Sequence, residues 1–312
     1  MHEAPATDLG ASQPPPPAVL AEDVGRGRTF WWRFVRTVIG PVGAALVLLT
    51  LVMAVFAPAI APHSPFTQFQ NGLSLDGVPV APQWHLPYIL GTDDLGRDVL
   101  SRLIWGARVS MEVGVFATLI NVGLGVLLGL VASTSGPIVE NALMRFTDMM
   151  MAFPFYLFVL LLVAIVGHTS TLTVVFVLGV LGWPPVVRMV RGQAVVVREL
   201  DYVQSSRASG ATQWRLMLRH ILPNVLPTIL VYASLTVSGN MMAESGLSFL
   251  GVGVPPTQPS WGGMIAEGLQ NYQTAPWILI FPGIALAIAC IGFNLVAEGM
   301  ADAMNVREGH GT

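Results

Sequence analysis

Long apolar runs without charged residues restrict the fold of this chain more than any other feature. The first of them, residues 37–62, contains no Asp, Glu, Lys or Arg. A helix needs about 20 residues to cross the hydrocarbon core of a bilayer. Because backbone polar groups in lipid must be satisfied internally, runs of this length predict helices and not barrel strands. The sequence therefore predicts an all-α integral membrane protein, in agreement with 53% hydrophobic residues, 11% charged residues and a mean hydropathy of +0.65.

The apolar runs predict six transmembrane helices. Pro184 and Pro185 should kink or end the fourth, because proline lacks the backbone N–H that a helix interior requires. Gly123, Gly125 and Gly129 in the second would allow a neighbouring helix to approach closely. The predicted spans are residues 37–62, 113–131, 149–166, 171–187, 224–243 and 277–296.

The same runs divide the chain into five segments. Residues 1–28 are rich in Pro and Ala and predict a disordered cytoplasmic tail, because they offer too little apolar surface to pack. Residues 29–65 predict an N-terminal membrane anchor helix, which begins with an aromatic and basic collar suited to a membrane interface. The remaining segments are an extracytoplasmic loop region at 66–106, a five-helix core at 107–303 with a polar loop at 199–223, and a cytoplasmic tail at 304–312.

A cleaved signal peptide is the alternative to the anchor helix. Ala59, Ile60 and Ala61 have the small-x-small pattern of a cleavage site. The apolar run that precedes them is too long for the hydrophobic region of a signal peptide. The sequence therefore favours a retained anchor.

The arginines predict the orientation of the chain in the membrane. With the N-terminus inside, only Arg97, Arg102 and Arg108 fall on outer segments, and the other 12 of the 15 basic residues fall on inner segments. Cytoplasmic loops carry the excess of positive charge in membrane proteins. Both termini and the loop at 199–223 are therefore expected in the cytoplasm.

Three aspartates follow one another closely in the outer loop, at Asp93, Asp94 and Asp98, beside glycines. A calcium site is one interpretation. The spacing differs from the calcium loop in which liganding residues alternate and a glutamate closes the loop. The residues favour a rigid, internally hydrogen-bonded loop.

The polar loop between the fourth and fifth spans predicts two short helices. Asp201 or Glu199 can start the first, Gly210 can end it, and Thr212 can cap the second. Pro223 should interrupt the backbone hydrogen bonds where the next span begins. Such a hinged pair at a membrane surface suits docking against a soluble partner. An ordinary basic loop that only sets the orientation is the alternative.

No constellation of catalytic or metal-binding residues is present in the sequence. The chain contains no lysine, and a Walker-type phosphate loop requires one, so ATP-driven work must be done by another subunit. The six histidines are scattered without a Glu-x-x-His pair, which predicts no metal site. The single cysteine, Cys290, lies in the last apolar run and is expected to pack as a small hydrophobe. No basic patch with interleaved aromatic residues indicates binding of nucleic acid.

Three residues near the outer end of the fifth span are candidates for the pathway of a transported substrate. Glu244 is a carboxylate close to the membrane, where ionisable residues are functional candidates by default. Met241 and Met242 bring flexible thioethers to the same place. Snorkelling or helix capping by Glu244 is the alternative.

The polar loop also resembles the coupling loop of ABC importer permeases. Gly210 is followed after nine residues by His220, Ile221, Leu222 and Pro223, as in that family. The family loop opens with Glu-Ala-Ala six residues before the glycine, where this chain has Gln204, Ser205 and Ser206. The glycine and the proline end match, whereas the acidic residue does not.

The resemblance extends to most of the chain beyond the tail. The segments ESGLSFLGVG at 244–253 and PSWGGMIAEGLQN at 259–271 are similar to the C-type permease subunit of dipeptide, oligopeptide and nickel ABC importers. This resemblance implies the ABC type I importer permease fold, with a cytoplasmic coupling helix that sits in a cleft of an ATP-binding subunit. The coupling residues implied are Asp201, Tyr202, Gln204, Ser205, Ser206, Gly210, Ala211, Trp214, Arg219, His220 and Pro223.

The resemblance further implies the partners and the location of the chain. The partners are a second, related permease, two ATP-binding subunits and an extracytoplasmic solute-binding protein. ATP and Mg are expected on the ATP-binding subunits, with no cofactor in this chain and no catalysis by it. The location implied is the bacterial inner membrane. Dipeptides, oligopeptides, nickel complexes, glutathione and sugars remain open as substrates, and a secondary transporter or a membrane enzyme is the rival class.

Overall fold

A computed structural model of the protein describes residues 25–83, 85, 87–167 and 170–305. Within these residues the chain is helical, and the only β-type pairing consists of the isolated bridges Leu73–Pro79 and Thr92–Asp98. Most of the predicted tails, residues 1–24 and 306–312, lies outside the described residues. The all-α prediction is confirmed.

The helices are α1 (Gly25–Arg36), α2 (Ile39–Val55), α3 (Ala57–Ile60), η1 (Gln70–Gly72), α4 (Val99–Thr134), α5 (Pro137–Ala152), α6 (Phe155–Val166), α7 (Thr171–Leu181), α8 (Pro184–Arg198), α9 (Asp201–Ala208), α10 (Gln213–Leu216), η2 (Met217–Ile221), α11 (Leu222–Phe249), α12 (Trp261–Gln270) and α13 (Trp277–Asn305).

Three stretches of the described residues are long and apolar enough to cross a membrane as single helices: Val99–Thr134, Gln213–Phe249 and Trp277–Met304. By length and composition there are up to five spans if the bent pairs α5–α6 and α7–α8 each count as one. The shorter apolar helix α2, with 17 residues, lies within the first predicted span. The six predicted spans therefore all fall on apolar helices, although two of them are bent and one is short.

Prolines account for the two bent pairs. Between α5 and α6 the axis turns by 88° at Phe153 and Pro154. Phe153 is extended, at φ −83° and ψ 135°, as expected for a residue that precedes proline. The predicted break at Pro184 is confirmed, because α7 ends at Leu181 and α8 begins at Pro184 with a bend of 40°.

The helix axis continues through Pro223, whereas the α-helical hydrogen bonding is interrupted directly before it, as predicted. Pro223 is the second residue of α11, which follows α10 and η2 without a break. A π-helical turn at Met217–Ile221 directly precedes the proline, and such a turn changes the hydrogen-bond register where the ring would clash. The side-chain amide of Asn224 also donates, through Nδ2, to the backbone carbonyl of His220 at 2.6 Å.

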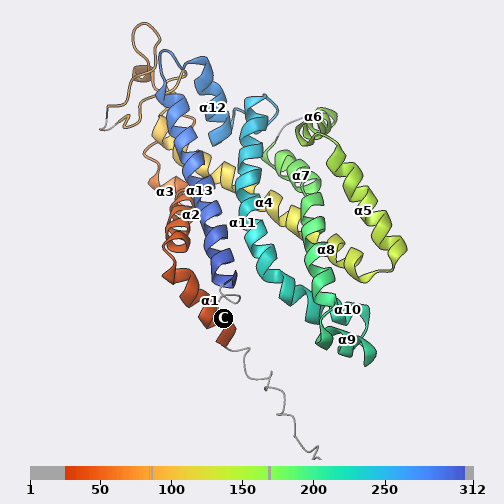
Figure 1. The fold of residues 1–312 in the computed structure, drawn as a ribbon. Coiled ribbons are helices and arrows are strands. Elements are labelled where there is room, and N and C mark those ends of the chain that lie inside the picture. Colours follow the sequence, from red (N-terminus) through yellow and green to blue (C-terminus); the bar gives the residue numbers. More distant parts are fainter. Residues whose placement is uncertain (1–24, 84, 86, 168–169, 306–312) are drawn as a thin grey trace, which may run out of the picture.

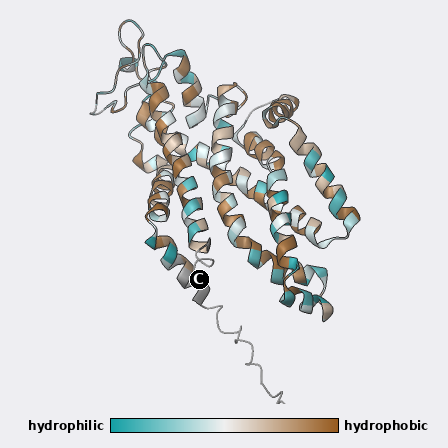
Figure 2. Cartoon of the chain, viewed as in Figure 1, coloured by the Kyte–Doolittle hydropathy of each residue, from teal (hydrophilic) through white to brown (hydrophobic). Residues whose placement is uncertain are grey.

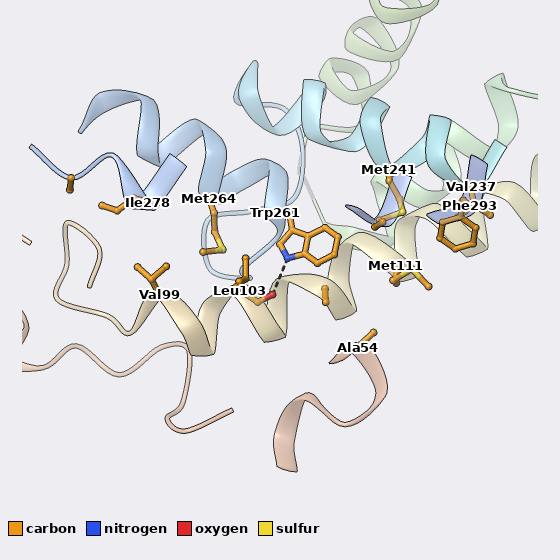
Figure 3. Packing of buried hydrophobic residues seen from close by; sticks show 13 residues of the cluster. Ala54, Val99, Leu103, Met111, Val237, Met241, Trp261, Met264, Ile278 and Phe293 are labelled. Atoms are coloured by element: carbon orange, nitrogen blue, oxygen red, sulfur yellow. Dashed lines mark hydrogen bonds between the residues drawn. The ribbon is translucent and has the colours of Figure 1, made fainter. Parts of the chain in front are cut away.

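The long helix α4 is the centre of the packing (Figure 1). It contacts α2, α7, α8 and α11, while α13 packs against α2, α11 and α12. One buried cluster fills the space among α4, α11, α12 and α13 around Trp261 and Met241 (Figure 3). The Trp261 indole N–H donates to the carbonyl of Leu103 at 2.9 Å, so its only polar atom is satisfied.

The two ends of the helices differ in character (Figures 1 and 2). The loop region before α4 lies at one end together with α12, and α1, α9 and α10 lie at the opposite end. The helices between the two ends are mostly apolar at their centres. Segments predicted to share the inner side of the membrane therefore share one end of the molecule. α1 begins at Gly25, inside the segment expected to be a tail.

Glycine allows α4 and α8 to touch. A Cβ atom on Gly129 would lie 2.8 Å from Cβ of Val190, and one on Gly125 would overlap Val186. Around Gly123, on the same helix, no atom lies within 4 Å of the corresponding position. The close-approach prediction therefore holds for Gly125 and Gly129, and Gly123 faces open space.

We expect Gly125→Leu to separate α4 from α8, because the new side chain would overlap Cβ and Cγ1 of Val186. These atoms lie close to the backbone of α8, so they cannot move aside as the end of a long, flexible side chain can. Overpacking of this kind costs about 1–3 kcal/mol. Thermal unfolding of the purified protein should show a clearly lower Tm. The matched control Gly123→Leu should unfold near the wild-type temperature, and equal loss in both variants would contradict the packing described.

Candidate coupling site

Two short helices form the candidate coupling site, and their ends follow the sequence. α9 begins at Asp201, an acidic residue whose charge suits the positive end of a helix dipole, although no side chain caps this end. After Ala208 the chain turns through Gly210 at φ +84°. Gly210 N–H donates to Arg207 O and Ala211 N–H to Ser206 O, which is the Schellman pattern of helix ends.

The predicted cap of the second helix is confirmed. The Thr212 hydroxyl accepts the N–H of Arg215 at 3.3 Å, and α10 starts at the next residue. Threonine at this position satisfies one of the N–H groups that the first turn leaves without a partner. The turn at Gly210 and this cap together fix the angle between α9 and α10.

Polar contacts tie the site to the helices on either side. Gln204 donates through Nε2 to the carbonyl of Arg198 at 3.1 Å and to the carboxylate of Glu199 at 3.3 Å. Ser206 Oγ lies 3.3 Å from Nε2 of His220, so α9 is also joined to η2. The side-chain amide of Gln204 thus joins α9 to the end of α8.

Apolar contacts complete the anchoring. Val203 of α9 and Leu216, Met217 and Ile221 of the second helix are buried in one cluster with residues of α4 and α8. The inward faces of both helices therefore pack as part of the core, and motion of the site would be transmitted to α8, α4 and α11.

The predicted coupling residues separate into an outward and an inward set. Trp214 is 60% exposed and Tyr202 is 48% exposed, although the Tyr202 hydroxyl accepts from Asn224 at 2.9 Å. Both sets lie on one short stretch of the chain. The outward set consists of exposed residues: Asp201, Tyr202, Ser205, Gly210, Trp214, Arg219 and Pro223. The inward set consists of half-buried residues: Gln204, Ser206, Ala211 and His220.

A cavity of about 400 Å³ lies between this site and the start of α5. Arg198 donates to the carbonyl of Ser133 at 2.7 Å, so the end of α8 is tied to the end of α4. Arg191 pairs with Glu140 through Nε at 2.9 Å and holds the start of α5 against α8. The lining residues are Thr134, Ser135, Gly136, Pro137, Glu140, Arg198, Val203, Arg207, Gln213, Leu216 and Ile221.

The three candidate pathway residues do not converge. Glu244 and Met241 are fully buried, and Met241 belongs to the cluster around Trp261, whereas Met242 is 59% exposed. The Glu244 carboxylate accepts from Ser248 at 2.7 Å and from Ser110 at 3.4 Å. Glu244 therefore joins α11 to α4 inside the protein.

Sequence reasoning missed the polar partners of these residues. Ser110 Oγ also accepts the N–H of Trp261 at 3.2 Å, which connects the Glu244 cluster to α12. Asn240 donates to Thr118 and to Asn121 at 3.0 and 2.9 Å. Serine, threonine and asparagine within apolar runs were the available signal, because a polar group in such a run must find a partner.

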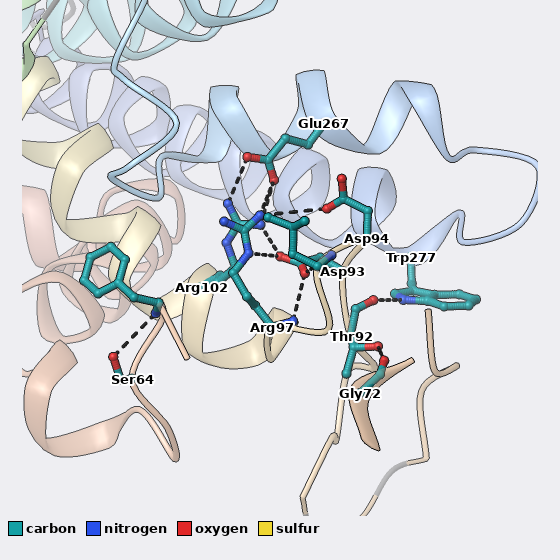
Figure 4. Close-up of polar contacts among 11 residues, drawn as sticks. Ser64, Gly72, Thr92, Asp93, Asp94, Arg97, Arg102, Glu267 and Trp277 are labelled. Atoms are coloured by element: carbon teal, nitrogen blue, oxygen red, sulfur yellow. Dashed lines mark hydrogen bonds and ion pairs between the residues drawn. The ribbon is translucent and has the colours of Figure 1, made fainter. Parts of the chain in front are cut away.

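The loop at 90–102 is internally hydrogen-bonded, as predicted (Figure 4). Asp93 is fully buried and accepts the N–H groups of Leu95 and Arg97 at 3.0 and 2.8 Å. Arg102 pairs with Asp93 and with Glu267 of α12, the second at 2.6 Å. Because arginines already occupy the Asp93 and Glu267 carboxylates, ion pairing explains these acids better than a calcium site.

Comparison with known proteins identifies the class. Residues 122–308 match the family described as binding-protein-dependent transport system inner membrane component. Residues 25–76 match the N-terminal TM domain of oligopeptide transport permease C. Since the first match covers more than half of the chain, the protein belongs to this family of inner-membrane transport permeases, and the C-type resemblance is confirmed.

Similar proteins carry names of the same kind. The chain is 36% identical to the di/tripeptide transport system permease protein DppC of Pseudomonas aeruginosa, over 98% of this chain and 97% of that protein. It is 39% identical to the dipeptide transport system permease protein DppC of Escherichia coli, over 88% and 91%. The glutathione transport system permease protein GsiD of Pectobacterium atrosepticum is 34% identical, over 89% and 90%.

A solved structure supports the fold. The chain is similar to a chain of the MetNI methionine ABC transporter in inward-facing conformations, with a TM-score of 0.52 and 17% identity. The likeness covers 64% of this chain and 96% of the other. The predicted ABC type I importer permease fold is thereby confirmed, and at this identity the likeness carries the fold alone.

We expect Arg102→Gln to destabilise the protein strongly, because it leaves Asp93 buried with one cation fewer and removes the link to Glu267. Removal of one partner from a buried ion pair costs about 3–5 kcal/mol. Thermal unfolding measures the change. Arg108→Gln, which breaks an exposed pair with Glu112, is the control and should cost less than about 1 kcal/mol.

Asp94 gives a prediction in pH. Partial burial, and then the charges of Asp93 and Glu267, raise the pKa of Asp94 above its ordinary value. A raised pKa in the folded state means that the stabilising contribution is complete below the unfolded pKa and is lost as pH rises through the folded pKa. Asp94→Asn should therefore raise the Tm at neutral pH, with an advantage that vanishes in acid.

Proposed function

We propose that this chain is the membrane-spanning subunit of an ATP-driven importer, in which it forms the translocation pathway together with a second, related permease. Family membership supports the importer class. The observation that carries the proposal is the coupling site: two short helices expose Trp214 and Tyr202 and bury their other faces against α8, α4 and η2. A partner that moves these helices would move the membrane helices with them.

The remaining partners and the orientation follow from this proposal. Two ATP-binding subunits hold ATP and Mg and contact the outward set of coupling residues from the cytoplasm. A solute-binding protein delivers substrate at the opposite end, near 66–106 and α12. Both chain termini are cytoplasmic, with residues 107–303 as the transport core. The positive charge of the inner segments supports this orientation.

The substrate that we propose is a short peptide. Relatives named for dipeptide, di/tripeptide, oligopeptide and glutathione transport support this class. Nickel complexes and sugars are the alternatives within the same family. Identification of the ligand on the cognate solute-binding protein would decide among them.

Near the outer end of α11 we propose separate roles for the three pathway candidates. Met242, which is exposed, is the one that can face the pathway. Glu244 and Met241 hold this end of α11 against α4 and α12, so they act on the outer gate through position. Unchanged uptake by Glu244→Gln at limiting substrate would exclude a gate role for the carboxylate.

Trp214→Ala tests the coupling site. A large exposed aromatic at the centre of an interface contributes about 2 kcal/mol or more to binding. We expect the ATP-binding subunits to dissociate from the purified complex and peptide-dependent ATP hydrolysis to fall at least tenfold, with the two permeases still paired. Phe116→Ala, which removes another exposed aromatic side chain from α4, is the control and should keep the ATP-binding subunits.

Gly210→Val provides a second, conformational test. At φ +84° a β-branched residue is strained, so the angle between α9 and α10 should change without loss of any contacting side chain. Loss of the ATP-binding subunits from this variant is the expected result. Their full retention in both variants, or uptake driven by a proton gradient with this chain alone, would overturn the proposal in favour of a secondary transporter.

A further inference from the structure

α1 is a basic and aromatic helix to which the proposed transport function assigns no role. Its sequence, GRGRTFWWRFVR, contains four arginines and no acidic residue within 12 residues. It lies at the same end of the molecule as α9 and α10 and directly precedes α2 (Figure 1). The chain therefore presents concentrated positive charge beside its first apolar helix.

One side of α1 is packed against the protein. Phe34 is buried, and its ring lies over Gly40 of α2 and Gly299 of α13. A Cβ atom on Gly40 would lie 2.9 Å from Cε2 of Phe34, and one on Gly299 would lie 3.2 Å from it. α1 is thus held against α2 and α13 through this ring and is part of the folded domain.

Another side of α1 is apolar and uncovered. Trp32 is 56% exposed and Val35 is 64% exposed. Exposed apolar side chains continue from there through Val38 and along α2, at Val42 and Leu49. α2 lies in the segment predicted to anchor the chain in the membrane, so the exposed side of α1 is continuous with a surface made for lipid.

Arg33 and Arg36 lie on the same part of α1 as this apolar surface. The Arg36 guanidinium is 3.8 Å from the centre of the Trp32 ring. Among the described residues, no carboxylate forms an ion pair with Arg33 or Arg36, although α13 exposes Glu298 and Asp302. Cations beside exposed tryptophan and valine match the boundary between lipid headgroups and acyl chains.

We propose that α1 is an interfacial helix that binds the headgroups of anionic phospholipids through Arg33 and Arg36, with Trp32 and Val35 in the outer part of the acyl region. Continuity with α2 selects lipid over a soluble protein as the occupant, because a protein would have to cover a surface that runs into the membrane. The assignment of α1 to the inner leaflet rests on the proposed function and its orientation. The binding of anionic lipid to α1 does not depend on either.

The first test measures lipid preference on the intact complex. The complex in detergent is titrated with phosphatidylglycerol and with phosphatidylcholine, and bound lipid is counted by native mass spectrometry. Each arginine near an anionic surface contributes roughly fivefold to binding. The double variant Arg33→Gln/Arg36→Gln should therefore bind phosphatidylglycerol about 25-fold more weakly, with binding of phosphatidylcholine unchanged.

Arg108→Gln/Arg145→Gln is the matched control, because it removes two exposed arginines from other helices. It should keep the wild-type preference. Equal loss in both double variants would show a response to overall charge and would overturn a site on α1. Equal binding of the two lipids by the wild-type complex would also overturn the proposed site on α1.

A second test determines the depth of α1. The chain has a single cysteine, so Val35→Cys in a Cys290→Ala background carries one spin label. In liposomes with phosphatidylglycerol the label should be accessible to oxygen and shielded from a water-soluble relaxation agent. A water-exposed label contradicts the proposal. Binding of the ATP-binding subunits is tested separately, with Trp214→Ala. A failure of the lipid proposal can therefore be told apart from a failure of the proposed transport function.

Discussion

The packing of α4 against α2, α7, α8 and α11 is the interaction on which the rest of the structure depends. Glycine brings α8 close enough for Val186 and Val190 to fill the gap. Helices in lipid gain little from burial of apolar side chains, so close approach and interhelical hydrogen bonds supply the specificity. Asn121 of α4 provides such bonds: it donates to the carbonyls of Leu178 and Gly179 on α7 and accepts from Asn240 on α11.

The two ends of α4 connect the loop region that precedes it to the candidate coupling site. At its start, Asp98 accepts the N–H groups of Leu100 and Ser101, and Arg102 reaches Glu267 on α12. At its other end, Ser133 accepts from Arg198, next to the start of the coupling segment. This 36-residue helix is therefore held by polar contacts at both ends, beside the loop region and beside the candidate coupling site.

Features set by local chemistry could be predicted from the sequence, and features set by distant partners could not. The cap at Thr212, the left-handed turn at Gly210 and the hydrogen-bonded loop around Asp93 each depend on residues a few positions apart. Arg102 and Glu267 are separated by 165 positions, and nothing in either local pattern indicates the pair. The π turn before Pro223 could not be predicted for a similar reason, since proline alone does not show which register its neighbours adopt.

Neighbouring residues at the candidate pathway show the same division. Met241 and Met242 are adjacent and chemically identical, yet one is fully buried and the other mostly exposed. Helix geometry turns successive side chains by about 100°, so the sequence could place both residues near the outer end of α11 but not their faces. The packing of α4 and α12 on one side decides which of the two is covered.

The pair α5–α6 exposes a continuous apolar surface. Ion pairs of Glu140 with Arg191 and of Asp148 with Arg188 hold α5 against α8, while its apolar residues project outward. Phe146, Met149 and Phe153 are all about half exposed or more, and α6 continues this surface with Leu157 and Ile165. Lipid can cover the apolar residues, and the ion pairs with α8 already satisfy Glu140 and Asp148. Under the proposed pairing, a second permease would cover this apolar surface together with lipid.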